Sequence, residues 1–203
     1  GKIIQPEAQL GDVVFVDQND DGKIDDADRI HLGTPNPRFT YGFTLSAAYK
    51  GFDLNAFVHG SQGNKIANYM YSVMYSTSMR EWSNSKEMMN RWTPDNADSD
   101  LPRVSDRDPN KNDRFSDRYV EDGSYLRLKT LQLGYTLPEY ISKKAFLNKA
   151  RIYVSADNLL TLTKYSGFNP EMGDLWGNPL NAGVDMASYP TPRVFTVGLN
   201  LTF

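Results

Sequence analysis

The sequence has no cysteine and only two histidines among its 203 residues. The absence of cysteine excludes disulfide scaffolds, thiolate zinc sites and cysteine nucleophiles. A histidine-based triad or a histidine-rich metal site has almost nothing to be built from, so we interpret His31 and His59 as ordinary polar positions. No pair of carboxylates stands out from the general acidity either. These gaps favour a protein that is not an enzyme.

Positive charge and long apolar runs are also scarce. The formal net charge is -3, which provides no basic field to hold a phosphate backbone and argues against nucleic acid as a partner. No stretch approaches the roughly 18 consecutive apolar residues of a membrane-spanning helix. Transmembrane strands, however, need only about 9 to 11 residues of alternating pattern, which leaves the hydropathy low. A membrane protein built from strands therefore remains compatible with the composition.

The sequence does contain five segments in which apolar residues alternate with small or polar ones. A period of two over such lengths predicts β-strands. Lys50-Gly51 is a plausible tight turn between the first two strands, and the apolar parity slips near Lys129-Thr130, as it does at a β-bulge. The segments cover residues 39–49, 52–59, 125–137, 150–158 and 195–203.

Short and long connections alternate between these strands. The first and second strands are joined by two residues, and the third and fourth by about 138–149, which we expect to hold one short helix. The other connections, about 62–122 and about 159–190, are rich in Asn, Asp, Ser, Gly and Pro. Loops of this length argue against a compact soluble domain, whereas outer-membrane barrels combine short periplasmic turns with long extracellular loops. We therefore predict an all-β chain, the C-terminal strands of a large antiparallel transmembrane β-barrel with long extracellular loops.

Residues 17–28 read DQNDDGKIDDAD and match the EF-hand type of calcium loop at its oxygen positions. Calcium takes about six to eight hard oxygen ligands, which carboxylates at every second residue around Gly22 can supply. Asp28 stands where a bidentate Glu is usual and is one methylene shorter. The alternative is a solvated acidic turn that binds no ion. A structural Ca²⁺, held within an extracellular loop over 1–38, would have as its ligands Asp17, Asn19, Asp21, the Lys23 carbonyl, Asp25 and Asp28.

Large aromatic side chains gather in the two long loops. Tyr and Trp offer a flat apolar face with a polar tip, which suits stacking on sugar rings or packing against a protein partner. Packing of the loops against each other is the favoured alternative. Tyrosines at the strand ends fit the interfacial girdle of a barrel; these are Tyr41, Tyr49 and Tyr135. The candidates for substrate contact are Tyr75, Trp82, Trp92 and Trp176.

Several runs resemble the late part of the SusC-like (SusC/RagA) TonB-dependent outer-membrane transporters. Together they span most of the chain, in the order of the family. The terminal Phe203, after alternating apolar residues, also resembles the sorting signal read by the outer-membrane assembly machinery. The runs are GDVVFVDQNDDGKIDDADRIHLGTPNPRFTYGFTLSAAYKGFDLNAFVHGSQGN, DGSYLRLKTLQLGYTLP, RIYVSADNLLTLTKYSGFNPE and RVFTVGLNLTF.

The resemblance implies that residues 39–203 form the last five strands of a barrel of about 22 strands in the lipid of the cell outer membrane. It also implies a plug and a TonB-contacting segment, both outside these residues. Members of the family pair with a SusD-type surface lipoprotein and import oligosaccharides or peptides through TonB, without covalent chemistry on the substrate. A soluble, calcium-dependent β-sandwich that binds glycans is the rival interpretation, although a sandwich rarely needs loops this long.

Overall fold

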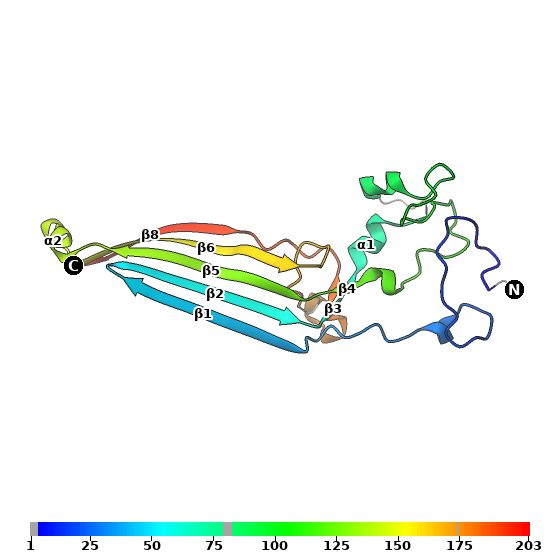
Figure 1. Cartoon of the computed structure of the whole chain (residues 1–203), viewed down its shortest axis with the longest axis horizontal. Helices are drawn as coiled ribbons and strands as arrows, with labels where there is room; N and C mark the ends of the chain where they lie inside the picture. The colour runs from blue at the N-terminus through cyan, green and yellow to red at the C-terminus, as the bar shows by residue number, and fades with distance from the viewer. Residues whose placement is uncertain (1–3, 79–82, 174) are drawn as a thin grey trace. The chain divides into compact units, whose positions relative to one another are not determined.

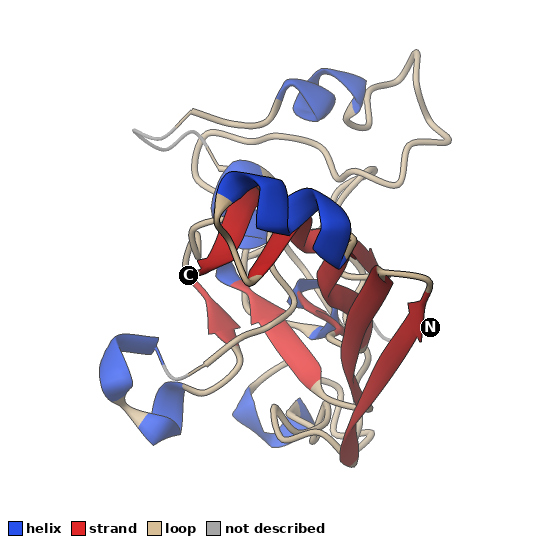
Figure 2. Cartoon of the chain, turned by 90° about the vertical axis from the view of Figure 1, so that its left-hand side faces the viewer, coloured by secondary structure: helices blue, strands red, loops and turns tan. Residues whose placement is uncertain are grey.

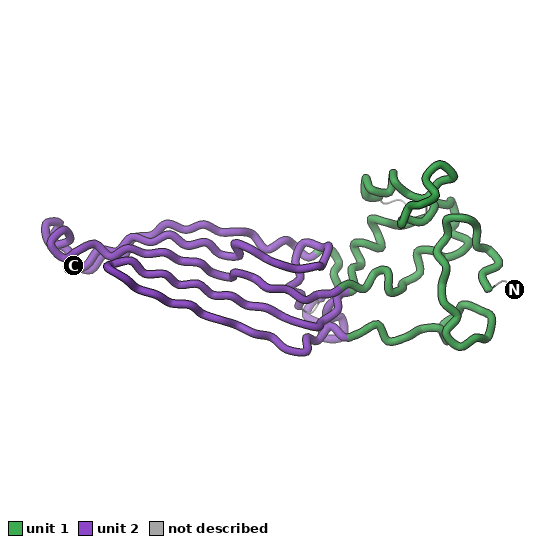
Figure 3. Tube along the Cα trace, viewed as in Figure 1, with its two compact units in different colours: residues 1–33, 67–121, 184–187 green, residues 34–66, 122–183, 188–203 purple. Residues whose placement is uncertain are grey.

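The computed structural model of the protein describes residues 4–78, 83–173 and 175–203. The chain divides into two compact units, shown in two colours in Figure 3. We call residues 34–66, 122–183 and 188–203 the sheet unit, and residues 1–33, 67–121 and 184–187 the loop unit. The N-terminal segment thus packs with the first long loop and does not stand alone.

The sheet unit is built on an antiparallel sheet whose strands follow one another in chain order (Figure 1). The order β1-β2-β5-β6-β8 confirms all five predicted strands, and β2 and β6 run several residues further than the alternation had indicated. Every neighbouring pair is antiparallel. The strands are β1 (Phe39–Tyr49), β2 (Phe52–Gln62), β5 (Tyr125–Thr136), β6 (Lys149–Thr163) and β8 (Val194–Thr202).

Two short connections close one end of the sheet, which we call the turn end; the opposite end is the loop end. Lys50 and Gly51 both have positive φ, as a type I′ hairpin turn requires. The connection between β5 and β6 carries α2 (Glu139–Ser142) and the 3-10 turn η4 (Lys143–Ala145), which confirms the short helix expected there. Figure 2 looks onto this end, with the helical turn in front.

A β-bulge interrupts the pairing in the middle of the sheet. The register between β5 and β6 shifts between Leu128 and Thr130, where the parity of the sequence slips. On β6, residues 158 and 159 stand opposite the single residue Lys129 of β5. Asn158 has a φ of 54°, and this left-handed conformation accommodates the extra residue of β6. Leu160 therefore pairs with Leu128, and the apolar alternation of β6 continues to the end of the strand.

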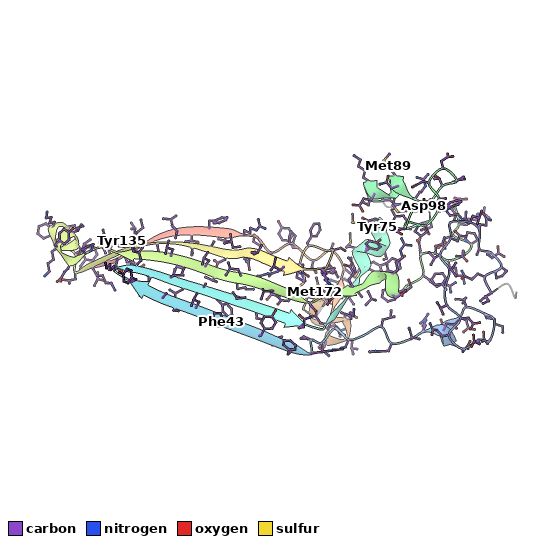
Figure 4. All side chains as sticks on the ribbon, in the orientation of Figure 1. Phe43, Tyr75, Met89, Asp98, Tyr135 and Met172 are labelled. Carbon is purple, nitrogen blue, oxygen red and sulfur yellow. The ribbon has the colours of Figure 1, made fainter. Side chains whose placement is uncertain are left out.

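One face of the sheet is apolar from edge to edge and largely exposed. The row one step in from the turn end includes Leu54, Leu133, Val154 and Val197, and Leu133 and Val154 in it are 47% and 49% exposed. Aromatic residues bound this face at both ends: Tyr49, Phe52 and Tyr135 at the turn end, and Phe39 and Tyr41 at the loop end. Figure 4 shows Tyr135 near the turn end. The band from Phe39 to Tyr49 extends about 33 Å along the strand, which at a strand tilt of about 40° gives a height of about 25 Å, that of the apolar band of an outer-membrane barrel wall.

The opposite face is polar and cross-linked between strands. Arg151 on β6 donates from Nε to Oδ1 of Asp53 on β2 (2.9 Å), and Thr130 donates to Asp157 (3.0 Å). Ser46 Oγ lies 2.7 Å from Asn55 Oδ1. Such an amphipathic sheet separates a lipid-like environment from an aqueous one.

The long connections contain short elements, and a small sheet of order β4-β3-β7. No helix of the described residues is both long and apolar enough to cross a membrane. The remaining elements are η1 (Asp26–Asp28), β3 (Lys65–Asn68), α1 (Tyr69–Met74), η2 (Lys86–Asn90), η3 (Asp117–Tyr119), β4 (Val120–Asp122), η5 (Leu175–Gly177), η6 (Pro179–Asn181) and β7 (Val184–Asp185).

Candidate functional sites in the loop unit

Asp12 joins the N-terminal segment to the first long loop. Arg103 donates from Nε and Nη2 to the two oxygens of Asp12 (2.7 and 3.0 Å), and Asn112 Nδ2 donates to Oδ1 (2.8 Å). The Asp12 side chain is only 1% exposed. Burial alone would raise the pKa of Asp12, but hydrogen bonds from Arg103, Asn112 and the Gln9 amide hold it below its usual value. The pair therefore fastens two segments 91 residues apart.

Asp113 organises a second buried polar cluster. It accepts hydrogen bonds from the Ser76 and Ser78 hydroxyls (2.6 and 2.8 Å) and from the amide and hydroxyl of Thr77 (2.6 and 2.8 Å). Burial would raise the pKa of Asp113, and these donors lower it below its usual value. Hydrophobic periodicity could not reveal this core, because most of its buried side chains are polar.

The acidic segment 17–28 is closed by hydrogen bonds from its own backbone. The Gly22 amide donates to Asp17 Oδ2 (2.7 Å), and the Lys23 amide to Asp21 Oδ1 (2.9 Å). Asp28 accepts from the amides of Asp25 and Gln18 (2.7 and 2.8 Å), which lowers its pKa. Gly22 has a φ of +79°, which fits the sharp turn expected at this position. The backbone of the segment therefore already curves around its own carboxylates, as it must in a loop whose oxygens bind a cation.

The fit of these residues to calcium is partial. Asp17 Oδ1 is buried and has no hydrogen-bond partner, so it is an oxygen suited to a cation. On the other hand, residues 4–78, 83–173 and 175–203 contain no group of three or more His, Cys, Asp or Glu arranged to hold a metal ion. The calcium site therefore stays a prediction, with the ligand set Asp17, Asn19, Asp21, the Lys23 carbonyl, Asp25 and Asp28.

A calcium titration of the full-length protein by calorimetry tests this prediction. We expect the Asp17→Ala, Asp21→Ala double variant to lose the heat of binding, because two ligand carboxylates are removed. Asp26→Ala is the matched control, since Asp26 lies outside the ligand positions and pairs with the exposed Arg29. If the unaltered protein also shows no heat at millimolar calcium, the segment is an acidic turn.

Trp92 lines two neighbouring hollows of the loop unit. One has a volume of about 500 Å³ and is also lined by Asp100 and Arg118. The other has a volume of about 760 Å³. The indole packs so closely on Gly11 that a Cβ there would overlap the ring, and the Trp92 amide donates to the Leu101 carbonyl (2.8 Å). The hollows thus offer a fixed aromatic plane beside side chains of both charges.

The other three aromatic candidates differ from Trp92. Tyr75 is stacked on Tyr71, with ring centroids 4.2 Å apart, and its hydroxyl donates to Glu87, which raises the pKa of Tyr75. Its contacts are therefore those of loop packing. Trp176 is 80% exposed. Trp82 lies outside the described residues.

Sequence comparison finds similar proteins among TonB-dependent receptors. Over 201 residues the chain is 42% identical to TonB-dependent receptor P3 of Formosa agariphila, covering 97% of this chain and 19% of that receptor. It is 34% identical to receptor P26 of the same organism and 26% identical to TonB-dependent receptor SusC of Bacteroides thetaiotaomicron. The chain thus spans about a fifth of the length of these curated relatives. No protein-family model matches it.

Solved structures give a consistent result. The fold matches the RagAB peptide importer in its closed-closed state with a TM-score of 0.70 and 31% identity, covering 84% of this chain and 18% of that chain. The match to the open-open state has a TM-score of 0.66. The open five-stranded sheet therefore corresponds to a fragment of a β-barrel.

Proposed function

Because this chain belongs to the SusC-like TonB-dependent receptors, as one part of their barrel, we propose that the full-length protein imports a nutrient across the cell outer membrane. The observation that carries the proposal is the two-faced sheet. Its exposed apolar band, with aromatic residues at both ends, suits outer-membrane lipid, and its polar face suits a water-filled lumen. In this arrangement the loop unit is extracellular.

The proposed import needs partners that lie beyond these residues. The likeness to SusC and to RagAB supports a SusD-type lipoprotein on the extracellular side and energy transfer from TonB, through segments outside this chain. RagAB is described as a peptide importer, so peptides stand beside oligosaccharides as the proposed substrate. The protein would move its substrate without covalent chemistry.

Charge is divided unevenly between the two units. The loop unit has 19 acidic and 11 basic residues, a net charge of -8, whereas the sheet unit has 6 and 11, a net charge of +5. A negative field at the entrance disfavours anionic substrates and favours neutral or cationic ones. We propose that Trp92 contacts such a substrate.

The importer role is tested in cells that lack the receptor and are complemented with the full-length gene. The probes are labelled neutral gluco-oligosaccharides and labelled lysine-containing peptides of positive net charge. We expect uptake of one probe class to require both the receptor and TonB, with the receptor recovered in the outer-membrane fraction. Uptake that is unchanged when TonB is deleted would contradict the proposal.

The same assay tests Trp92. We expect Trp92→Ala to raise the KM for uptake about tenfold, which corresponds to about 1.4 kcal/mol of lost contact. Phe146→Ala is the control, because Phe146 is 91% exposed and lies in the short connection at the turn end of the sheet. If the Trp92 variant is present at normal abundance and its KM is unchanged, Trp92 does not contact the substrate.

A further inference from the structure

Arg127 lies on the polar face of the sheet, and each of its three guanidinium nitrogens donates a hydrogen bond. Its register partners are His59 on β2 and Thr161 on β6, both on that face, and its side chain is 3% exposed. It donates from Nε to Thr161 Oγ1 (2.9 Å), from Nη1 to Glu171 Oε2 (2.6 Å) and from Nη2 to Asn169 Oδ1 (2.8 Å). Two of its three partners therefore belong to the connection after β6.

The segment that Arg127 holds, residues 165–171, is itself preorganised; we call it the inner segment. The Glu171 amide donates to Asn169 Oδ1 (3.1 Å), the same oxygen that Arg127 binds. Lys129 Nζ lies 3.1 and 3.2 Å from the two oxygens of Glu171. At the other end Tyr165 is 5% exposed. Both ends are thus fixed.

Between these two anchors the inner segment displays Phe168, which is 74% exposed. Figure 4 shows Met172, the neighbour of Glu171, at the loop end of the sheet. Because Arg127 and Lys129 project from β5, the inner segment lies along the polar face of the sheet. A residue displayed on a segment held at both ends can bind with little loss of backbone conformational freedom.

We propose that Phe168 contacts the transported molecule at the extracellular end of the lumen, and that Arg127 and Glu171 are positioning residues that hold it there. This inference rests on the proposed importer function, which makes the polar face the lumen wall. An ion pair with a buried guanidinium is well suited to such a task, because it specifies one arrangement of the inner segment even where it adds little stability. Lys129 supports it by sharing the carboxylate of Glu171.

The positioning step is tested by hydrogen exchange on the full-length receptor, which needs no substrate. We expect Glu171→Ala to speed amide exchange in residues 165–171 at least tenfold, and Glu171→Gln to have a smaller effect, because it keeps an acceptor for Arg127. Asp53→Asn is the matched control, since it breaks an ion pair with Arg151 on the same face without touching this segment. Unchanged exchange in the Glu171→Ala receptor would overturn the positioning role.

The contact step is tested by uptake kinetics with the same two probes. We expect Phe168→Ala and Glu171→Ala each to raise the KM several-fold with Vmax unchanged, and the double variant to add nothing further, because Glu171 acts through Phe168. Asp53→Asn should leave the KM unchanged. The proposal would be overturned if the KM increases of the two single variants added up in the double variant, or if Phe168→Ala left the KM unchanged. Faster amide exchange in the plug of the Phe168→Ala receptor would also overturn it, because the substitution would then act on the receptor's structure. Absence of TonB-dependent uptake by the unaltered receptor defeats the importer function instead, whatever the exchange result.

Discussion

Replacing Leu133 with arginine is expected to destabilise the folded barrel by about 2 kcal/mol, because Leu133 lies inside the apolar band, one row in from the aromatic residues of the turn end. Leu133 lies on the middle strand β5, and its row continues to Leu54 and Val154 on the apolar face. A guanidinium at this depth would have to leave water and enter the hydrocarbon layer. Reversible urea unfolding of the full-length receptor in lipid vesicles measures the loss.

Gln132→Arg is the matched control, because Gln132 is the next residue on the same strand and faces the polar side. We expect a loss well below that of Leu133→Arg. Leu199→Arg should fall between the two, because the register pairs Leu199 with Ile152, in the same row as the turn-end Tyr135, where a charge costs less. Equal losses for Leu133→Arg and Gln132→Arg would show that the two faces are assigned wrongly.

Replacing Asp12 with alanine is expected to loosen the loop unit by about 3 kcal/mol, because the Arg103 guanidinium then stays partly buried without its partner. The side chains of Asp12 and Arg103 are 1% and 18% exposed. Hydrogen exchange of the Val13 and Arg103 amides, which bind Asn112 and the Gly11 carbonyl, reports the change. The sheet unit should keep its protection.

Asp106→Ala is the control for this change. Asp106 pairs with Arg107 at 3.8 Å, and the two side chains are 79% and 91% exposed, so its loss should be barely measurable. If Asp12→Ala and Asp106→Ala give the same protection in the loop unit, the Asp12 pair does not fasten the two segments.

The same carboxylates predict how the loop unit responds to pH. The folded-state pKa values of Asp12 and Asp113 lie below the usual 3.8. Their stabilising contribution is therefore complete above that pH and is lost as pH falls through the folded-state values. Acid should loosen the loop unit before it affects the apolar band of the sheet, which carries no carboxylate.

The strands could be predicted because their signal is local. Alternation with period two identifies β1 and β8, and the parity slip near Lys129 locates the bulge. The prediction for β6 ended about five residues early, at 158, because the polar Asn158, in a left-handed conformation, interrupts the series of apolar residues there. Only the pairing with β5 shows that the strand continues.

The sequence by itself therefore determined the five strands, their turns and the division into an apolar and a polar face, since each depends on neighbouring residues and leaves a periodic trace. Only the tertiary structure decided that Asp12 meets Arg103, that Asp113 gathers Ser76 to Ser78, and that the inner segment returns to Arg127. These contacts join polar side chains far apart in the chain. Hydrogen bonds of that kind follow no sequence period, and they form only when folding brings donor and acceptor together.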